Sequence, residues 1–299
     1  MPLNFRPLPR DYLPLEVAIE PKLPGARDKL VAMLERMASE DPGLRPVIDS
    51  ETGQARLHLA SESQLQAAVA AFAKDGVDVN VGAPQIAYRE MLSAPVESDY
   101  AHKNQTAGQF ASVKLRFEPS QRSMSNTFIN SAAPERVPAE FVQAVEKGFR
   151  AVANSGPFAG FPVVACRATL LDGVCHDVDS SPLAFELATR AAFREAASQA
   201  AIKLLEPYLE IDITTPEAFS AAVVADFKKR RGVNTAKETS PGVVAIYGFA
   251  PLANMLGYEA HLRSVTQGRS TYSWKLAGLE EAPMDDGKPP FEPAAAKRG

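Results

Sequence analysis

Cysteine is scarce in this chain, which has only Cys166 and Cys175 among its 299 residues. Two cysteines cannot form the disulfide framework of a secreted domain, so we expect a reducing, cytoplasmic setting. Their spacing is not the short C-x-x-C type of a zinc site. The four histidines are far apart in sequence: His58, His102, His176 and His261. We therefore predict no metal site.

Long apolar runs are also missing. No stretch approaches the roughly eighteen consecutive apolar residues that span a membrane, and the proline-rich residues 1–14 lack the apolar core of a secretory signal. The formal net charge of −4 provides no overall attraction to nucleic acid. Any contact with RNA must therefore come from local clusters of basic side chains.

No G-x-x-x-x-G-K-[ST] sequence is present, so nothing predicts a loop that cradles nucleotide phosphates. His176, Asp177, Asp179 and Ser180 could be interpreted as a catalytic set, but a triad needs side chains that converge beside an oxyanion site. Neighbours in a single turn mostly point apart. We predict no catalytic residue in this chain and keep a hydrolase centred on His176 as a rival.

Apolar periodicity predicts two βαββαβ units, one near each end of the chain. The first consists of a strand at 15–20, a helix at 26–39, strands at 45–49 and 54–60, a helix at 62–74 and a strand at 77–81. The second consists of a strand at 209–213, a helix at 216–230, strands at 233–238 and 243–249, a helix at 251–267 broken near Gly257, and a strand at 271–276. This order is that of split-βαβ, ferredoxin-like domains.

The region between these units has predicted strands near 86–93, 110–117 and 125–130, a helix near 138–153, an apolar strand at 161–171 and a helix at 182–203. The short polar stretch 170–182 joins the last two. Ser181 before Pro182 is a typical helix start, and we expect Asp179 and the serines to cap this helix. His176 is then presented near the tip of the turn.

Several segments resemble, in order, the C-terminal half of bacterial translation elongation factor G. Residues 15–22 and 38–42 resemble the start of its third domain, and residues 81–90 resemble that domain's exit. Residues 159–164 and 176–181 resemble the fourth domain. The fifth domain is matched by four segments: 204–207, 230–232, 251–255 and 262–269.

The resemblance implies an α+β fold of three domains, in which two ferredoxin-like domains flank an elongated α/β middle domain with ribosomal-protein-like βαβ topology. We expect a linker at 1–13, domains at 14–88, 89–205 and 206–280, and a loose tail at 281–299. The implied protein is a cytoplasmic monomer that engages the ribosome. GTP and Mg²⁺ would bind only in the family's GTPase domain, which would act in cis in a full-length chain.

In the family, the tip loops of the fourth domain contact transfer RNA and messenger RNA in the small-subunit decoding region. His176 falls on the family's tip histidine. The implied tip contacts are His176, Asp177, Asp179, Ser180, Lys103, Gln105 and Gln109. The fifth domain contacts ribosomal RNA and the protein at the base of the large-subunit stalk, and its implied contacts are Lys229, Arg230, Arg231, Arg263, Gln267 and Arg269.

The basic run Lys228-Lys229-Arg230-Arg231-Gly232 has a second interpretation. Cations favour the C-terminal end of a helix, and a glycine caps it. Four consecutive cations exceed what a cap needs, so contact with phosphate groups stays open beside the capping role. Arg263, Gln267 and Arg269 share one polar turn, which could also be ordinary solvated surface.

Some features depart from the family pattern. The family's first two domains have no counterpart here, so either the sequence is part of a longer chain or the protein lacks them. The tip loop 103–110 is shorter than in the family, and residues 60–65 and 233–240 differ from it. A ribosome-protection or biogenesis relative, or an RNA-binding module without a GTPase, therefore remains an alternative to a translocation factor.

Overall fold

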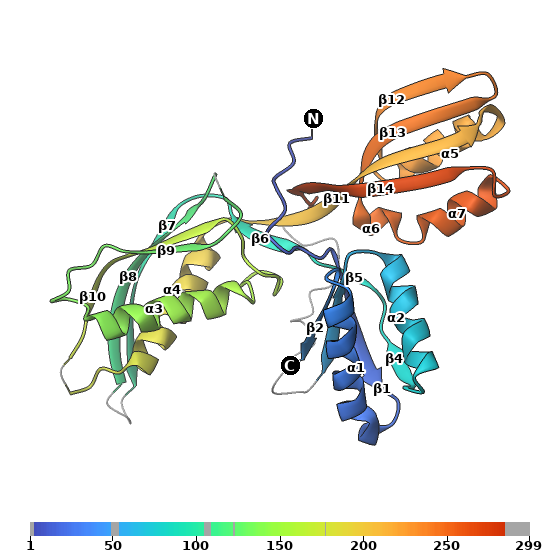
Figure 1. Ribbon diagram of the computed structural model, residues 1–299. Helices are drawn as coiled ribbons and strands as arrows, with labels where there is room; N and C mark the ends of the chain where they lie inside the picture. Colours follow the sequence, from blue (N-terminus) through green and yellow to red (C-terminus); the bar gives the residue numbers. More distant parts are fainter. Residues whose placement is uncertain (1–2, 49–53, 105–108, 122, 177, 285–299) are drawn as a thin grey trace. The chain divides into compact units, whose positions relative to one another are not determined.

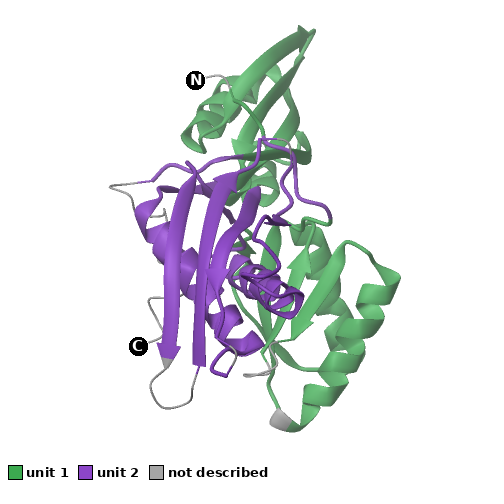
Figure 2. Ribbon diagram, turned by 90° about the vertical axis from the view of Figure 1, so that its left-hand side faces the viewer, with its two compact units in different colours: residues 1–5, 11–87, 206–279 green, residues 6–10, 88–205, 280–299 purple. Residues whose placement is uncertain are grey.

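The computed structural model describes residues 3–48, 54–104, 109–121, 123–176 and 178–284. These residues form two compact units (Figure 2). Unit 1 contains residues 1–5, 11–87 and 206–279, and unit 2 contains residues 6–10, 88–205 and 280–299. Each unit is described by itself below.

The first half of unit 1 is a split-βαβ fold, as the sequence predicts. Its elements are β1 (Leu15–Pro21), the 3-10 turn η1 (Pro24–Ala26), α1 (Arg27–Glu40), β2 (Leu44–Ile48), β3 (Ala55–Leu59), α2 (Glu62–Lys74), β4 (Val79–Val81) and the short β5 (Gln85–Ile86). The strand order β2-β3-β1-β4 is antiparallel at each contact. Leu15, Val17 and Ile19 alternate along β1 and are at most 1% exposed, which places the core under this sheet.

The second half of unit 1 repeats the same topology (Figure 1). Its elements are β11 (Ile202–Pro216), α5 (Glu217–Lys229), β12 (Val233–Ser240), β13 (Val243–Pro251), α6 (Leu252–Met255), α7 (Tyr258–Val265) and β14 (Thr271–Glu281), in the strand order β12-β13-β11-β14. The predicted helix break is confirmed, because Gly257 adopts a left-handed φ of 69° between α6 and α7. Two ferredoxin-like folds are therefore present.

The N-terminal segment that the sequence suggests as a linker contacts unit 1. The Phe5 ring lies 4.9 Å from the Phe249 ring and 5.6 Å from the Tyr208 ring, measured between centroids. The Tyr12 hydroxyl donates to Ala87 O at 2.6 Å. Sequence periodicity could not predict these contacts, because they depend on partners far along the chain.

Unit 2 is built on a sheet of four strands in the order β7-β8-β10-β9. Its elements are β6 (Arg89–Leu92), β7 (Val96–Asn104), β8 (Gln109–Pro119), β9 (Thr127–Asn130), α3 (Ala139–Ala153), β10 (Cys166–Val174) and α4 (Pro182–Gln199). β9 and β10 are parallel and are joined through α3, which confirms the predicted βαβ topology. The other neighbours in this sheet are antiparallel.

Both helices of unit 2 pack on one face of the sheet. Phe117 of β8 contacts Phe149 of α3 and Phe193 of α4, and all three rings are at most 1% exposed. The helices approach each other closely at Gly148, where a Cβ would lie 2.7 Å from Glu186 O. The opposite face of β8, which carries Lys114 and Arg116, is solvent-exposed.

The sequence-based prediction of unit 2 needs two corrected boundaries and one added strand. The apolar strand starts at Cys166 and not near 161, and it continues to Val174. The helix predicted to reach residue 203 ends at Gln199, since Ile202–Leu205 pair with β6 as the beginning of β11. Strand β7 was not predicted, because its sequence VESDYAHKN lacks a regular apolar alternation. No helix in the described ranges is long and apolar enough to cross a membrane.

Candidate nucleic-acid interface

The loop 175–181 connects the end of β10 to the start of α4. Ser181 is the N-cap of α4, and its hydroxyl accepts a hydrogen bond from Ala184 N at 3.2 Å. Pro182 follows at the first helical position, where its missing N–H costs nothing. This start is the one that the sequence predicts. The Ser180 hydroxyl does not cap α4 as predicted, because it bonds to His176 N and Phe110 O, and the Asp179 carboxylate lies beside the His176 imidazole.

His176 is exposed on this loop, with 60% of its side chain accessible. Its Nδ1 lies 3.4 Å from Asp179 Oδ2 and 3.5 Å from Val178 N. Ser180 Oγ binds the backbone N of His176, and not the imidazole, at 2.8 Å. A nucleophilic serine needs its hydroxyl beside the imidazole, so this arrangement does not form a triad.

The start of β8 lies against the same loop. Phe110 N donates to Asp179 O at 2.7 Å, and Phe110 O accepts from Ser180 Oγ at 2.8 Å. Lys103 pairs with Phe110 across the β7–β8 ladder, and its Nζ lies 5.7 Å from the centre of the Phe110 ring. Gln109, which begins β8, is half-buried beside them.

The structure therefore brings together five of the predicted tip residues: His176, Asp179, Ser180, Lys103 and Gln109. Asp177 and Gln105 lie outside the described residues. Phe110 is the member that sequence reasoning did not assign, although it closes the predicted 103–110 loop. A backbone carbonyl and N–H that bind a distant loop leave no sequence signal.

An ion pair between Arg136 and Asp172 lies near this tip. Arg136 Nε lies 3.0 Å from Asp172 Oδ1, and this guanidinium lowers the pKa of the Asp172 carboxyl. Among the described residues, no group of three His, Cys, Asp or Glu side chains could hold a metal ion. What the exposed loop can do is contact a partner through an imidazole, backbone groups and Lys103.

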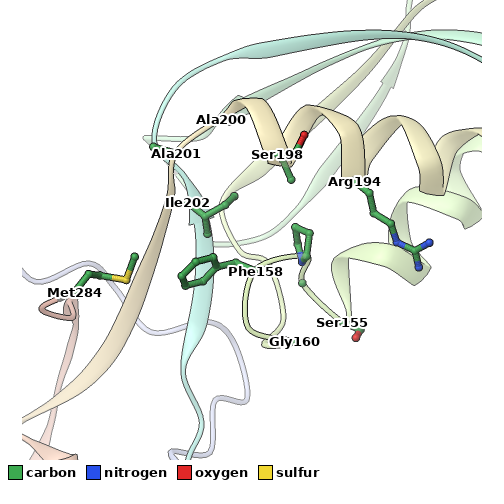
Figure 3. A pocket seen from close by; sticks show the side chains of 12 residues that line it. Ser155, Phe158, Gly160, Arg194, Ser198, Ala200, Ala201, Ile202 and Met284 are labelled. Atoms are coloured by element: carbon green, nitrogen blue, oxygen red, sulfur yellow. The ribbon is translucent and has the colours of Figure 1, made fainter. Parts of the chain in front are cut away.

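A cavity of about 740 Å³ lies at the opposite end of α4 (Figure 3). It is lined by Ser155, Gly156, Pro157, Phe158, Gly160, Arg194, Ala197, Ser198, Ala200, Ala201, Ile202 and Met284. Its lining contains two hydroxyl groups, of Ser155 and Ser198, but no histidine, cysteine or carboxylate that could act as a base beside them. An 18-residue helix spans about 27 Å, which separates this cavity from the His176 loop.

A buried carboxylate that the sequence did not single out fixes the wall of this cavity. Glu90 is fully buried, and its oxygens accept from Ala159 N at 2.7 Å, Phe158 N at 3.0 Å and Phe161 N at 3.1 Å. Burial raises the pKa of Glu90, and the backbone N–H groups partly offset that rise. Glu90 therefore holds the 156–161 turn to β6.

The basic run that ends α5 is engaged largely within unit 1. Arg230 Nε lies 3.1 Å from Asp226 Oδ2, and Arg230 Nη1 donates to Asn254 O at 2.8 Å. Arg231 donates through both terminal nitrogens to Glu206, which is 1% exposed. Lys228 and Lys229 are exposed. These contacts with Asp226, Asn254 and Glu206 engage the two arginine side chains, whereas the two lysine side chains are exposed.

The cap of α5 differs from the predicted glycine cap. Arg231, with a φ of 63°, occupies the left-handed position, and Gly232 follows it. Gly232 N donates to Phe227 O and Arg231 N to Lys228 O, which is the Schellman pattern. Gly232 is needed for space, because a Cβ there would lie 2.5 Å from Phe227 O.

The remaining predicted residues of unit 1 lie at the end of α7. Arg263 is exposed and pairs with Glu259 at 3.0 Å. Gln267 ends the helix at a φ of 56°, and its Oε1 accepts from Arg269 at 2.8 Å. The Arg269 guanidinium lies 4.7 Å from the centre of the Phe219 ring. These three side chains form one polar turn, as the sequence suggests.

Two split-βαβ folds combined with a βαβ domain that carries an exposed loop define the class: a multidomain α+β protein with an elongation-factor architecture. Family models describe three consecutive parts of the chain. Residues 14–83 match elongation factor G domain III, residues 84–201 match domain IV, and residues 203–288 match the elongation factor G C-terminus. The chain belongs to the elongation factor G family and corresponds to its C-terminal half.

Individual relatives agree with this assignment. The chain is 41% identical over 274 residues to elongation factor G of Paracoccus denitrificans and, over the same length, to that of Cereibacter sphaeroides. Both alignments cover 91% of this chain and 39% of the relative. A crystal structure of a Thermus thermophilus protein matches with a TM-score of 0.68 and 30% identity, covering 93% of this chain and 42% of that one. The chain thus spans about two fifths of the length of these relatives.

Proposed function

We propose that this chain is the ribosome-engaging half of a translation elongation factor that acts in translocation. In this proposal, the loop 175–181 and the adjoining start of β8 contact transfer RNA and messenger RNA in the small-subunit decoding region. The observation that carries the proposal is the exposed His176, presented at the end of the unit 2 sheet in a chain of the elongation factor G family.

The proposal assigns contact and not bond chemistry to this tip. The exposed imidazole of His176 and the ammonium of Lys103 on the adjoining strand β7 suit contacts with RNA backbone and 2′-hydroxyl groups. Ser180 is committed to Phe110 and to the His176 backbone, which argues against the rival hydrolase. Three domains at 14–88, 89–205 and 206–280 would carry the lever, with no cofactor of their own. GTP and Mg²⁺ would bind in the family's GTPase domain.

The polar turns of unit 1 would provide the second contact. Lys229, Arg263 and Arg269 are exposed or held at a surface turn, where they can approach ribosomal RNA and the stalk-base protein. Arg230 and Arg231 contribute through the fold of that surface, because their guanidinium groups bind Asp226 and Glu206. We propose a cytoplasmic monomer that binds ribosomes.

Co-sedimentation of this chain with ribosomes tests the proposal directly. The wild-type chain should pellet with ribosomes, and His176→Ala should weaken that binding while leaving the circular dichroism spectrum unchanged. Glu35→Ala, on the exposed face of α1 in unit 1, serves as the control and should bind normally. Absence of binding by the wild-type chain would refute the proposal.

A further inference from the structure

The hydroxyl of Ser180 joins two segments that are 70 residues apart in sequence. Its Oγ accepts from His176 N at 2.8 Å and donates to Phe110 O at 2.8 Å. Two backbone bonds close the same cluster, from Ser180 N to His176 O at 3.0 Å and from Phe110 N to Asp179 O at 2.7 Å. Two of these hydrogen bonds connect the His176 loop to the start of β8, from Ser180 Oγ to Phe110 O and from Phe110 N to Asp179 O, and the other two close the loop on itself.

This role separates Ser180 from its neighbour Ser181. The Ser181 hydroxyl accepts from Ala184 N and serves α4 alone. The Ser180 hydroxyl uses its proton on one segment and its lone pair on the other, so it cannot also cap the helix. The two adjacent serines therefore make different contacts, and substituting each of them gives a matched pair of variants.

Joining the two segments affects how much of the surface is already ordered when a partner binds. Lys103 packs over the Phe110 ring, and His176 and Asp179 lie on the other segment. If the segments moved independently, a partner would have to order both of them, and that ordering costs affinity. With Ser180 in place, the imidazole and the Lys103–Phe110 pair belong to one surface whose backbone is already fixed.

We propose that Ser180 is a positioning residue that joins the loop 175–181 and the start of β8 into one preorganised RNA-contacting surface. This inference rests on the proposed function of the tip. It assigns to Ser180 a structural part in recognition, acting through the His176 and Phe110 backbones, in place of the direct RNA contact that the family resemblance implies for this residue.

The test compares five chains: wild type, Ser180→Ala, Ser180→Thr, Ser181→Ala and Lys103→Ala. Hydrogen exchange of the His176 and Phe110 amides reports the joint itself. Co-sedimentation with ribosomes at several salt concentrations reports recognition. A typical intramolecular hydrogen bond changes an equilibrium by roughly fivefold, so Ser180→Ala should speed exchange of both amides by about 5- to 25-fold and weaken ribosome binding by about fivefold.

Two further readouts distinguish positioning from general damage. Because no charge is removed, the dependence of log affinity on log salt should keep its slope in Ser180→Ala, whereas Lys103→Ala should reduce it. Ser180→Thr keeps the hydroxyl and should restore exchange and binding to within about twofold of wild type. Ser181→Ala should speed exchange at Ala184 and leave exchange of the His176 and Phe110 amides unchanged.

The outcomes distinguish a failure of the positioning role from a failure of the proposed function. Loosened amides with normal ribosome binding in Ser180→Ala would overturn the positioning role while the proposed function stands, as would unchanged amides or a failure of Ser180→Thr to restore binding. A wild-type chain that does not bind ribosomes would overturn the proposed function and, with it, this inference. Loosening, weaker binding at constant salt slope, and rescue by threonine together support it.

Discussion

Replacing Glu90 should release the 156–161 turn from β6. The carboxylate accepts three backbone N–H groups at 2.7 to 3.1 Å and is fully buried. Hydrogen bonds to a charged group contribute about 1.5–3 kcal/mol each, although such contributions do not add fully. Glu90→Ala removes all three and leaves buried N–H groups without their acceptor, so we expect about 4 kcal/mol of destabilisation in unit 2.

Glu90→Gln isolates one of these bonds. Oε1 accepts from Ala159 N and Phe161 N, and Oε2 accepts from Phe158 N. A glutamine oxygen can keep the first two, but its NH₂ group then faces the Phe158 N–H. We expect a loss of about 2 kcal/mol, with the largest rise in hydrogen exchange at Phe158.

The assay is urea unfolding followed by circular dichroism, together with hydrogen exchange resolved by residue. Trp274, the single tryptophan, lies in unit 1, so its fluorescence reports the unit that the substitution does not touch. Glu97→Gln, on an exposed ion pair with Arg116, is the control and should change stability by less than about 0.5 kcal/mol. Wild-type protection of Phe158, Ala159 and Phe161 in Glu90→Ala would refute the reasoning.

Three other predictions concern Glu90, Gly232 and Cys166. Because the folded-state pKa of Glu90 is raised, the folded state binds more protons than the unfolded state above pH 4.5. The contribution of Glu90 to stability should therefore fall as pH rises from 4.5 through the raised pKa. A wild-type minus Glu90→Gln difference in unfolding free energy that grows over this window would contradict this prediction. Gly232→Ala should destabilise unit 1 by about 2 kcal/mol, because the new Cβ would clash with the Phe227 carbonyl oxygen and ring. Trp274 fluorescence during urea unfolding measures this loss. An unchanged unfolding midpoint would contradict the prediction and show that the α5 cap can shift. Burial raises the pKa of the Cys166 thiol to about 12. Iodoacetamide at pH 8 should therefore label the half-buried Cys175 and spare Cys166, which mass spectrometry of the peptides would show. Equal labelling of both cysteines would contradict this and mean that the core around β10 opens readily.

The two ferredoxin-like folds could be predicted because their information is local. Leu15, Val17 and Ile19 alternate in sequence as they do in burial, and the Ser61 cap at the start of α2 lies where the helix prediction begins. Gly257 marks the break between α6 and α7 by its own backbone preference. Each of these signals lies within a few residues of the element that it defines.

The misplaced boundaries of unit 2 have non-local causes. Residues 161–165 are apolar enough to suggest a strand, but Val164 N binds Glu90 O, Ala165 N binds Met124 O, and Ala165 adopts a φ of 54°. The chain after Gln199 is apolar enough to continue a helix, yet Ser93 N binds Ala201 O and β6 pairs with residues 202–205. In both cases, hydrogen bonds to residues far away in the sequence set where the helix or strand ends.

The candidate site likewise has features that the sequence predicts and features that it does not. The capped start of α4 and the exposure of His176 could be predicted, because a serine–proline pair and a short polar turn are local signals. The Ser180–Phe110 connection could not, since it depends on a strand 70 residues earlier in the chain. The engagement of Arg230 and Arg231 within unit 1 likewise required the positions of Asp226, Asn254 and Glu206.

Single-round translocation tests most directly the claim that the His176 loop works by contact with transfer RNA and messenger RNA. The measurement compares wild type and His176→Ala in a full-length factor that carries the GTPase domain, with rates of transfer RNA movement and GTP hydrolysis recorded on the same ribosomes. Slower movement at an unchanged hydrolysis rate is the predicted result. Equal loss of both rates, or movement at the wild-type rate, would contradict the role assigned to this tip.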